Sequence, residues 1–74
     1  MNAERRKLIQ QAQDLIGEAV TLLEIARDEE QGYFDNMPEA FQAANKGDKA
    51  TTAIDGLESV LSDIAGWDFE EILS

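Results

Sequence analysis

Apolar residues recur with helical spacing over the first third of the chain. Three series repeat every seven residues: Leu8, Leu15 and Leu22; Ile9, Ile16 and Leu23; Ala12, Ala19 and Ala26. A heptad repeat of this length predicts a long helix that packs against other helices. We expect it over residues 3–31, with Asn2 as its N-cap. The leucines should form one edge of its apolar stripe, the Ile/Leu series the middle and the alanines the other edge.

A second apolar pattern occupies the C-terminal half of the chain. Its members, Ile54, Leu57, Leu61 and Ile64, fall at heptad spacing, Ala50 extends the series, and Ala53 and Val60 flank it. Asp48 follows a glycine and is the candidate N-cap, and Gly66 is the candidate stop. These signals predict a helix over residues 48–65.

Turn-forming residues separate the two helical patterns. Asp35 and Asn36 favour a turn, and the single proline, Pro38, suits the first position of a short helix. Residues 32–47 are therefore predicted to be a connector that contains a short helix. In the tail, Asp68 is placed to cap a final turn, so residues 66–74 are predicted to form a C-terminal helical turn.

Together these elements predict an all-α, single-domain fold over residues 1–74: an antiparallel helical hairpin with a short connector helix and a short C-terminal helical turn. The first helix, at about 43 Å, would exceed the second, at about 27 Å, and leave apolar surface uncovered. A chain of 74 residues also buries a small core. A homodimeric bundle solves both problems. The predicted self-association residues are Leu8, Leu15, Leu22, Ala12, Ala19 and Ala26.

Charge restricts the class of partner. Six basic and sixteen acidic residues give a net charge of −10. This charge repels nucleic acid and anionic lipid and attracts basic surfaces. We therefore expect neither direct nucleic-acid binding nor membrane binding, but a partner protein with a basic surface. The alternative is that the charge only keeps a small helical protein soluble.

Acidic and aromatic residues are the candidate partner contacts. Asp28, Glu29 and Glu30 lie near the C-terminal end of the first helix, where the helix dipole disfavours them. Glu24 and Asp28 are one turn apart, about 6 Å, close to the phosphate repeat of a nucleic-acid strand. The tail is an acidic-aromatic segment that either packs on the hairpin or docks into a partner. The predicted partner-binding residues are Glu24, Asp28, Glu29, Glu30, Tyr33, Phe34, Trp67, Phe69, Glu70 and Glu71.

The residue types needed for common catalytic and metal sites are missing. The chain has no cysteine and no histidine, so it lacks disulfides, thiolate ligands and the commonest general base. Nearly every acid lies outside the apolar stripe, where a carboxyl group is not desolvated as catalytic pairs require. We expect no catalytic residues, no cofactor and no metal. A small chain without cysteine fits a reducing cytoplasm.

The centre of the chain resembles a set of short acidic proteins encoded by bacteriophages and prophages. The matching residues are Arg27–Gln31, Phe34–Met37, Pro38 and Glu39, followed by a helix of the type Ala53–Val60. The likeness covers about residues 7–65, and the tail from Gly66 departs from it. The family is mostly of unassigned function. The resemblance therefore implies a phage origin, a helical hairpin and a bacterial host cytoplasm rather than an activity.

Two functions remain open from the sequence. The leading hypothesis is a small acidic phage-type factor that binds and modulates or inhibits a host protein by mimicking nucleic-acid charge. The alternative is a self-associating structural helical module whose charge serves only solubility. Capture of a host protein, together with the mass of the protein in solution, separates the two.

Overall fold

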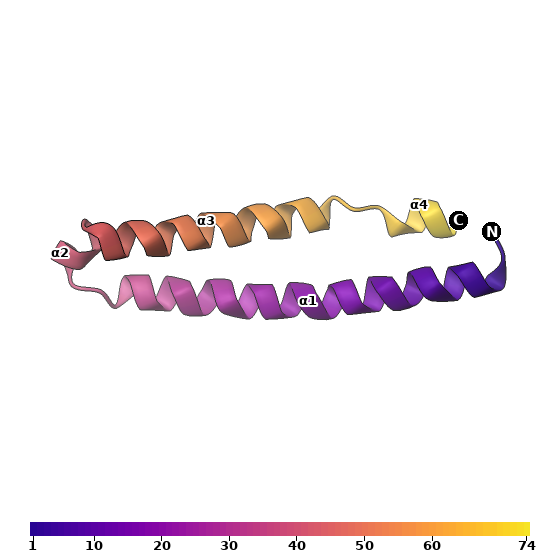
Figure 1. Cartoon of the computed structure of the whole chain (residues 1–74), viewed down its shortest axis with the longest axis horizontal. Helices are drawn as coiled ribbons and strands as arrows, with labels where there is room; N and C mark the ends of the chain where they lie inside the picture. Colours follow the sequence, from indigo (N-terminus) through magenta and orange to yellow (C-terminus); the bar gives the residue numbers. More distant parts are fainter.

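The computed structural model describes residues 1–74 and is all-α, as predicted. The chain forms α1 (Ala3–Asp35), α2 (Glu39–Gln42), α3 (Asn45–Ala65) and α4 (Phe69–Leu73). Figure 1 shows α1 and α3 side by side and antiparallel, with the short α2 at the turn. Both termini lie at the opposite end, so the hairpin has a turn end and a terminal end.

Side-chain caps fix both ends of α1. Asn2 is the N-cap as predicted, and its Oδ1 accepts a hydrogen bond from the backbone N–H of Arg5 at 2.9 Å. The helix ends at Asp35, four residues beyond the predicted end at residue 31. Asn36 then donates from its Nδ2 to the carbonyl oxygen of Gly32 at 2.9 Å. The extra turn also brings Phe34 to a half-buried position.

The start of α3 differs from the prediction. The helix begins at Asn45, so Asp48 lies in its first turn and is not the N-cap. Gly47 is buried, and a Cβ atom built on it would overlap the backbone carbonyl of Gln42. Gly47 therefore allows the close approach of α2 to α3 and does not end a helix. Gln42 closes the turn by donating from its Nε2 to the carbonyl oxygen of Phe34 at 3.0 Å.

The tail is an ordered helix that lies against α1. Asp68 caps α4 as predicted, because its Oδ1 accepts from the backbone N–H of Glu71 at 3.1 Å. Phe69 and Leu73 are half-buried, and the guanidinium of Arg6 donates from Nη1 to the carbonyl oxygen of Leu73. Trp67 stays 53% exposed, with its ring edge-to-face to that of Phe69 at a centroid distance of 6.4 Å.

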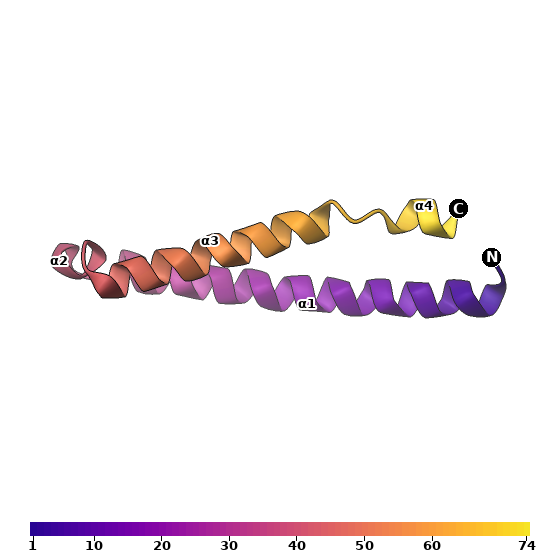
Figure 2. The ribbon, with the colours of Figure 1, turned by 45° about the horizontal axis from the view of Figure 1, so that its top comes forward.

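One row of buried and half-buried residues on each long helix joins α1 to α3. We call these rows the seam. The seam residues are Ile9, Ile16, Val20, Leu23, Arg27, Glu30 and Phe34 on α1, and Gly47, Ala50, Ile54, Leu57, Leu61 and Ile64 on α3. Only Gly47, Ala50 and Ile54 are buried, and all three lie in the half of α3 nearer the turn. Figure 2 shows α3 inclined to α1. The core is therefore small and concentrated near the turn end.

The seam corrects two details of the predicted apolar stripe. Val20 belongs to none of the three heptad series of the predicted stripe, but it is a half-buried seam residue. The alanine series was expected on an outer edge, but it lies between the leucine series and the Ile/Leu series. Ala12 is four residues after Leu8 and three after Ile9, which puts it between them around a helix of 3.6 residues per turn.

The molecule is long and thin. Its principal extents are 58 × 16 × 13 Å, and its radius of gyration is 17.4 Å, against about 11 Å for a compact domain of this length. Its accessible surface is 5636 Å², whereas a compact protein of 8.2 kDa has about 4,500 Å². A pair of helices with no further layer leaves both broad faces of the hairpin open to other molecules.

Candidate functional site

The seam divides the remaining surface of the hairpin into two broad faces. Each helix turns about 100° per residue, so the residue before a seam residue lies about a quarter turn to one side, and the residue after it lies to the other. Both helices are right-handed and they run in opposite directions. The preceding residues of both helices therefore fall on one face of the hairpin, and the following residues fall on the opposite face.

The face formed by the preceding residues is apolar. We call it the apolar face. On α1 it consists of Leu8, Leu15, Ala19, Leu22 and Ala26, together with Ala12 of the same alanine series, and on α3 of Ala53 and Val60. All eight are exposed, and the leucines at positions 8, 15 and 22 are 64%, 65% and 67% exposed. Monomeric soluble proteins rarely expose a continuous apolar strip of this kind, so the face has the character of an interface.

Charged residues on this side are confined to the ends of the apolar face. Glu29 follows its last alanine on α1, Lys46 and Lys49 precede Ala53 on α3, and Asp63 follows Val60. The eight residues of the apolar face are therefore uncharged, and the charged residues nearest to them include both acids and bases.

The face formed by the following residues is acidic. We call it the acid face, and it consists of Glu24, Asp28 and Asp35 on α1 with Asp48, Asp55 and Glu58 on α3. All six are exposed, and no lysine or arginine occupies an equivalent position. Asp28 alone has an ion-pair partner, since its Oδ1 lies 3.1 Å from the Nε of the seam residue Arg27. Most of this negative charge is therefore uncompensated within the chain.

The four predicted partner-binding acids of the first helix do not form one cluster. Glu24 and Asp28 lie on the acid face, Glu29 lies at the end of the apolar face, and Glu30 is a half-buried seam residue. Only Glu24 and Asp28 therefore remain together in one acidic surface.

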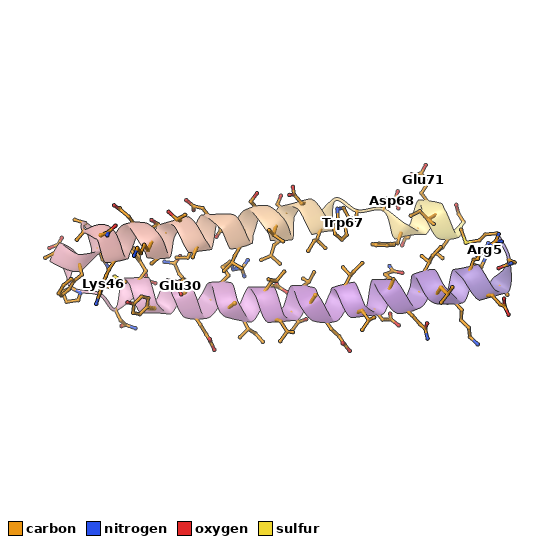
Figure 3. All side chains as sticks on the ribbon, in the orientation of Figure 1. Arg5, Glu30, Lys46, Trp67, Asp68 and Glu71 are labelled. Atoms are coloured by element: carbon orange, nitrogen blue, oxygen red, sulfur yellow. The ribbon has the colours of Figure 1, made fainter.

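The predicted aromatic contacts lie in two separate regions. Tyr33 and Phe34 are in the last turn of α1 at the turn end. Figure 3 shows Trp67 beside the middle of α1 and Glu71 near the terminal end, far from Glu30 and Lys46. Phe69 and Glu70 belong to α4 with Glu71. The structure therefore does not join the two predicted halves of the partner-binding set.

A shallow hollow marks the turn end. It measures about 370 Å³ and is lined by Tyr33, Asn36, Met37, Pro38, Phe41 and Lys46. The ammonium of Lys46 lies 5.8 Å from the centre of the Phe41 ring, which is a cation–π distance. The connector is thus both the turn of the hairpin and an aromatic rim around this hollow.

Four members of the acid face were missing from the predicted site: Asp35, Asp48, Asp55 and Glu58. Each directly follows a seam residue, and this was the signal in the sequence that could have found them. Asp55 follows Ile54, and Glu58 follows Leu57. Their proximity to Glu24 and Asp28 needs the antiparallel pairing of α3 with α1, which only the structure provides.

No group of three or more carboxylates lies close enough together to hold a metal ion. None of the four helices combines the length and the apolar character needed to cross a membrane. Comparison with known proteins finds no matching family model, no matching curated protein and no matching solved structure. The fold and its surface define the class of this protein as an elongated helical hairpin with one apolar face and one acid face.

Proposed function

We propose that this protein is a small acidic protein-binding factor that binds a basic surface of another protein through its acid face. In the setting that the phage resemblance implies, the target is a host protein in the bacterial cytoplasm, which the factor modulates or inhibits. The protein acts by occlusion, because carboxylates occupy the positions that phosphates would take on a nucleic-acid-binding surface. No chemical step is required of it.

The observation that supports this proposal is the unequal sharing of charge between the two faces. Six carboxylates lie on the acid face without a lysine or arginine among them, whereas the apolar face is neutral. If the acids served only solubility, they could lie at any exposed positions. No face of the hairpin would then need to lack lysine and arginine. A one-sided arrangement produces a directed field, which steers a basic partner to that side.

The spacing of the acids supports the mimic form of the proposal. Glu24 and Asp28 are one turn apart on α1, and Asp55 and Glu58 are three residues apart on α3. Such pairs are separated by about 6 Å along a helix. Two antiparallel rows of regularly spaced negative charge are a feature that a nucleic-acid-binding groove recognises through its lysine and arginine side chains.

The test is affinity capture from host lysate with charge-matched variants. The first variant, E24Q/D55N/E58Q, removes three carboxylates from the acid face. The control variant, D14N/E18Q/E39Q, removes three exposed carboxylates that lie off that face. The net charge of the two variants is identical, so a difference between them reports the position of the charge. We expect the wild type and the control to retain a host protein that the acid-face variant loses.

Two results contradict the proposal. Equal loss of binding in both variants indicates unspecific ion exchange rather than a directed surface. Equal retention indicates that the captured protein contacts another part of the hairpin. With the wild type, binding should also fall steeply as salt is raised, because the charges involved are exposed and screened.

A second function is favoured by the apolar face. In this reading the protein is a self-associating structural module, and its carboxylates serve only solubility. The mass in solution tests self-association directly: sedimentation equilibrium should give twice the 8.2 kDa of the chain. A dimer that captures no host protein supports the structural module alone. A dimer that captures one through the acid face supports both functions, each on its own face.

A further inference from the structure

We infer that the occupant of the apolar face is a second copy of this chain, packed with its α1 antiparallel to the first α1 in one defined register. In this register the two-fold axis passes midway between Leu15 and Ala19. Each leucine of the face then meets an alanine: Leu8 meets Ala26, Leu15 meets Ala19, and Leu22 meets Ala12 of the second copy. This inference rests on the self-association proposed above and is independent of the acid face.

The exposed area has the size that such a pairing needs. The accessible surface of 5636 Å² exceeds the value for a compact protein of this mass by about 1,100 Å². A standard interface buries about 800 Å² on each partner. One copy of the chain can therefore supply a full half-interface from its excess surface without unfolding any part of the hairpin.

The alternation of large and small residues selects the antiparallel direction. Along the face of α1, leucine and alanine alternate at steps of four and three residues, from Leu8 to Ala26. A parallel partner would place leucine against leucine and alanine against alanine, which gives crowded layers and empty layers. An antiparallel partner places a leucine against an alanine in every layer, so the layers have equal volume and the helices approach evenly.

Charge selects the same direction. Arg5 and Lys7 lie in the first turns of α1, and Glu29 and Glu30 lie near its other end. Figure 3 shows Arg5 at the terminal end and Glu30 toward the turn end of the hairpin. The register brings Arg5 level with Glu29 of the second copy, because these positions sum to the same value as Leu8 with Ala26. A parallel pairing would instead place Arg5 against Arg5 and Glu29 against Glu29.

The helix α1 of the second copy is a better partner for α1 than α3 of the second copy. The apolar series of α1 begins at Leu8, close to the terminal end, whereas α3 ends at Ala65 beside the middle of α1 (Figure 1). If two hairpins stacked with their turn ends together, α1 would face α3 of the other copy. Leu8 would then meet no long helix. Only an α1 partner covers the whole leucine series.

Disulfide trapping tests the register, because the native chain contains no cysteine. Two variants, L8C and A26C, are mixed under oxidising conditions, and the mixed disulfide is identified by mass. We expect the mixture of L8C with A26C to cross-link efficiently. L8C alone is the control, since two copies of position 8 come together only in a parallel pairing. Circular dichroism shows that each variant remains helical.

Each outcome is decisive for a different claim. A wild-type mass of 8.2 kDa at millimolar concentration overturns self-association and this inference with it, but leaves the acid-face proposal unaffected. A dimer in which L8C cross-links to itself overturns the register alone. A dimer in which neither L8C alone nor the mixture of L8C with A26C cross-links overturns both pairings of α1 across the apolar face.

A charge-swap cycle provides an independent test of the register. Arg5 and Glu29 are both exposed in the single hairpin and lie at the two ends of the apolar face. R5E and E29R should each raise the dimer dissociation constant about tenfold, because each change places like charges together twice in a two-fold dimer. The double variant R5E/E29R should restore the wild-type value. Additive weakening in the double variant would show that the two side chains do not meet.

Discussion

The apolar face and the acid face lie on the same two helices, one residue to either side of the same seam. Leu22 precedes the seam residue Leu23, and Glu24 follows it. Within three consecutive residues the chain thus contributes to the apolar face, to its own core and to the acid face. The apolar face is the surface proposed for self-association, and the acid face is the surface proposed for a basic partner. The comparison shows that a two-helix hairpin can carry two surfaces of opposite character when each is kept strictly to its own side.

This arrangement has a structural cost, which pairing through the apolar face would reduce. A two-helix hairpin buries few residues, and only Ala50, Ile54 and Gly47 are buried in this chain. Pairing through the apolar face would add the missing helical layer and leave the acid face of each copy pointing outward. A dimer would then present two acid faces on opposite sides, each as accessible as in the single hairpin.

The largest effect is expected from a charge placed within the apolar face. Leu15→Glu should raise the dimer dissociation constant by about 100-fold or more, because a carboxylate without a partner would be desolvated between the two copies. Leu15 is 65% exposed in the single hairpin, so the helices themselves should persist. Sedimentation should show the mass falling to that of one chain, with helical circular dichroism retained.

The matched control for Leu15→Glu places the same charge on the opposite side of α1. Gln10 is exposed and directly follows the seam residue Ile9, so Gln10→Glu adds a carboxylate on the acidic side. The dimer mass should not change. If both variants dissociated the dimer equally, net charge rather than the apolar face would control association, and the contrast between the faces would fail.

The next effect should come from the turn that aligns both faces. Gly47→Ala introduces a methyl group where the carbonyl of Gln42 already lies. Forcing α2 away from α3 should lower the free energy of unfolding by about 1–3 kcal/mol. Urea unfolding at fixed protein concentration measures the change. Both faces should weaken together, because they share the seam that this turn closes.

Gly17→Ala is the control for the change at Gly47. A Cβ atom on Gly17 would meet nothing within 4 Å, and alanine is favoured over glycine inside a helix by about 0.5–1 kcal/mol. This variant should therefore be more stable than the wild type. A loss of stability at Gly17, or none at Gly47, would show that the turn does not have the close packing described.

The helical class, the start of α1 and the end of α3 could be predicted from local signals. The heptad series, the Asn2 cap and the Asp68 cap each depend on neighbouring residues, so the sequence contains them directly. The start of α3 could not be predicted in this way. Asn45, Lys46 and Gly47 have the local character of a helix end, and only the contact of Gly47 with Gln42 shows why a glycine stands inside the helix.

The candidate site was predicted only in part, for a similar reason. The leucine and alanine series were predicted to be self-association residues, and they are exposed in the single hairpin. A wide stripe does not reveal, however, which series faces the chain's own second helix. Val20 decides that choice, because its half-buried position brings the seam to one side of α1. The acid face could not be predicted without knowing how the two helices pair. Asp55 lies on the same face as Glu24 only because α3 packs antiparallel to α1.

The smallest expected effect concerns the stability cost of the acid face. In E24Q/D55N/E58Q, two like-charge pairs disappear: Glu24 with Asp28, and Asp55 with Glu58. Each such pair destabilises a helix by about 0.2–0.5 kcal/mol. The variant should therefore unfold at slightly higher urea than the wild type in low salt, and the difference should vanish at 1 M salt because screening removes the repulsion.

The stability of E24Q/D55N/E58Q should be interpreted together with its result in the capture experiment. A variant that is more stable and yet loses the partner would show that the acid face lowers stability while it provides binding, as functional surfaces commonly do. A variant that is less stable than the wild type would show that these carboxylates support the fold. In that case their one-sided placement would need no partner to explain it.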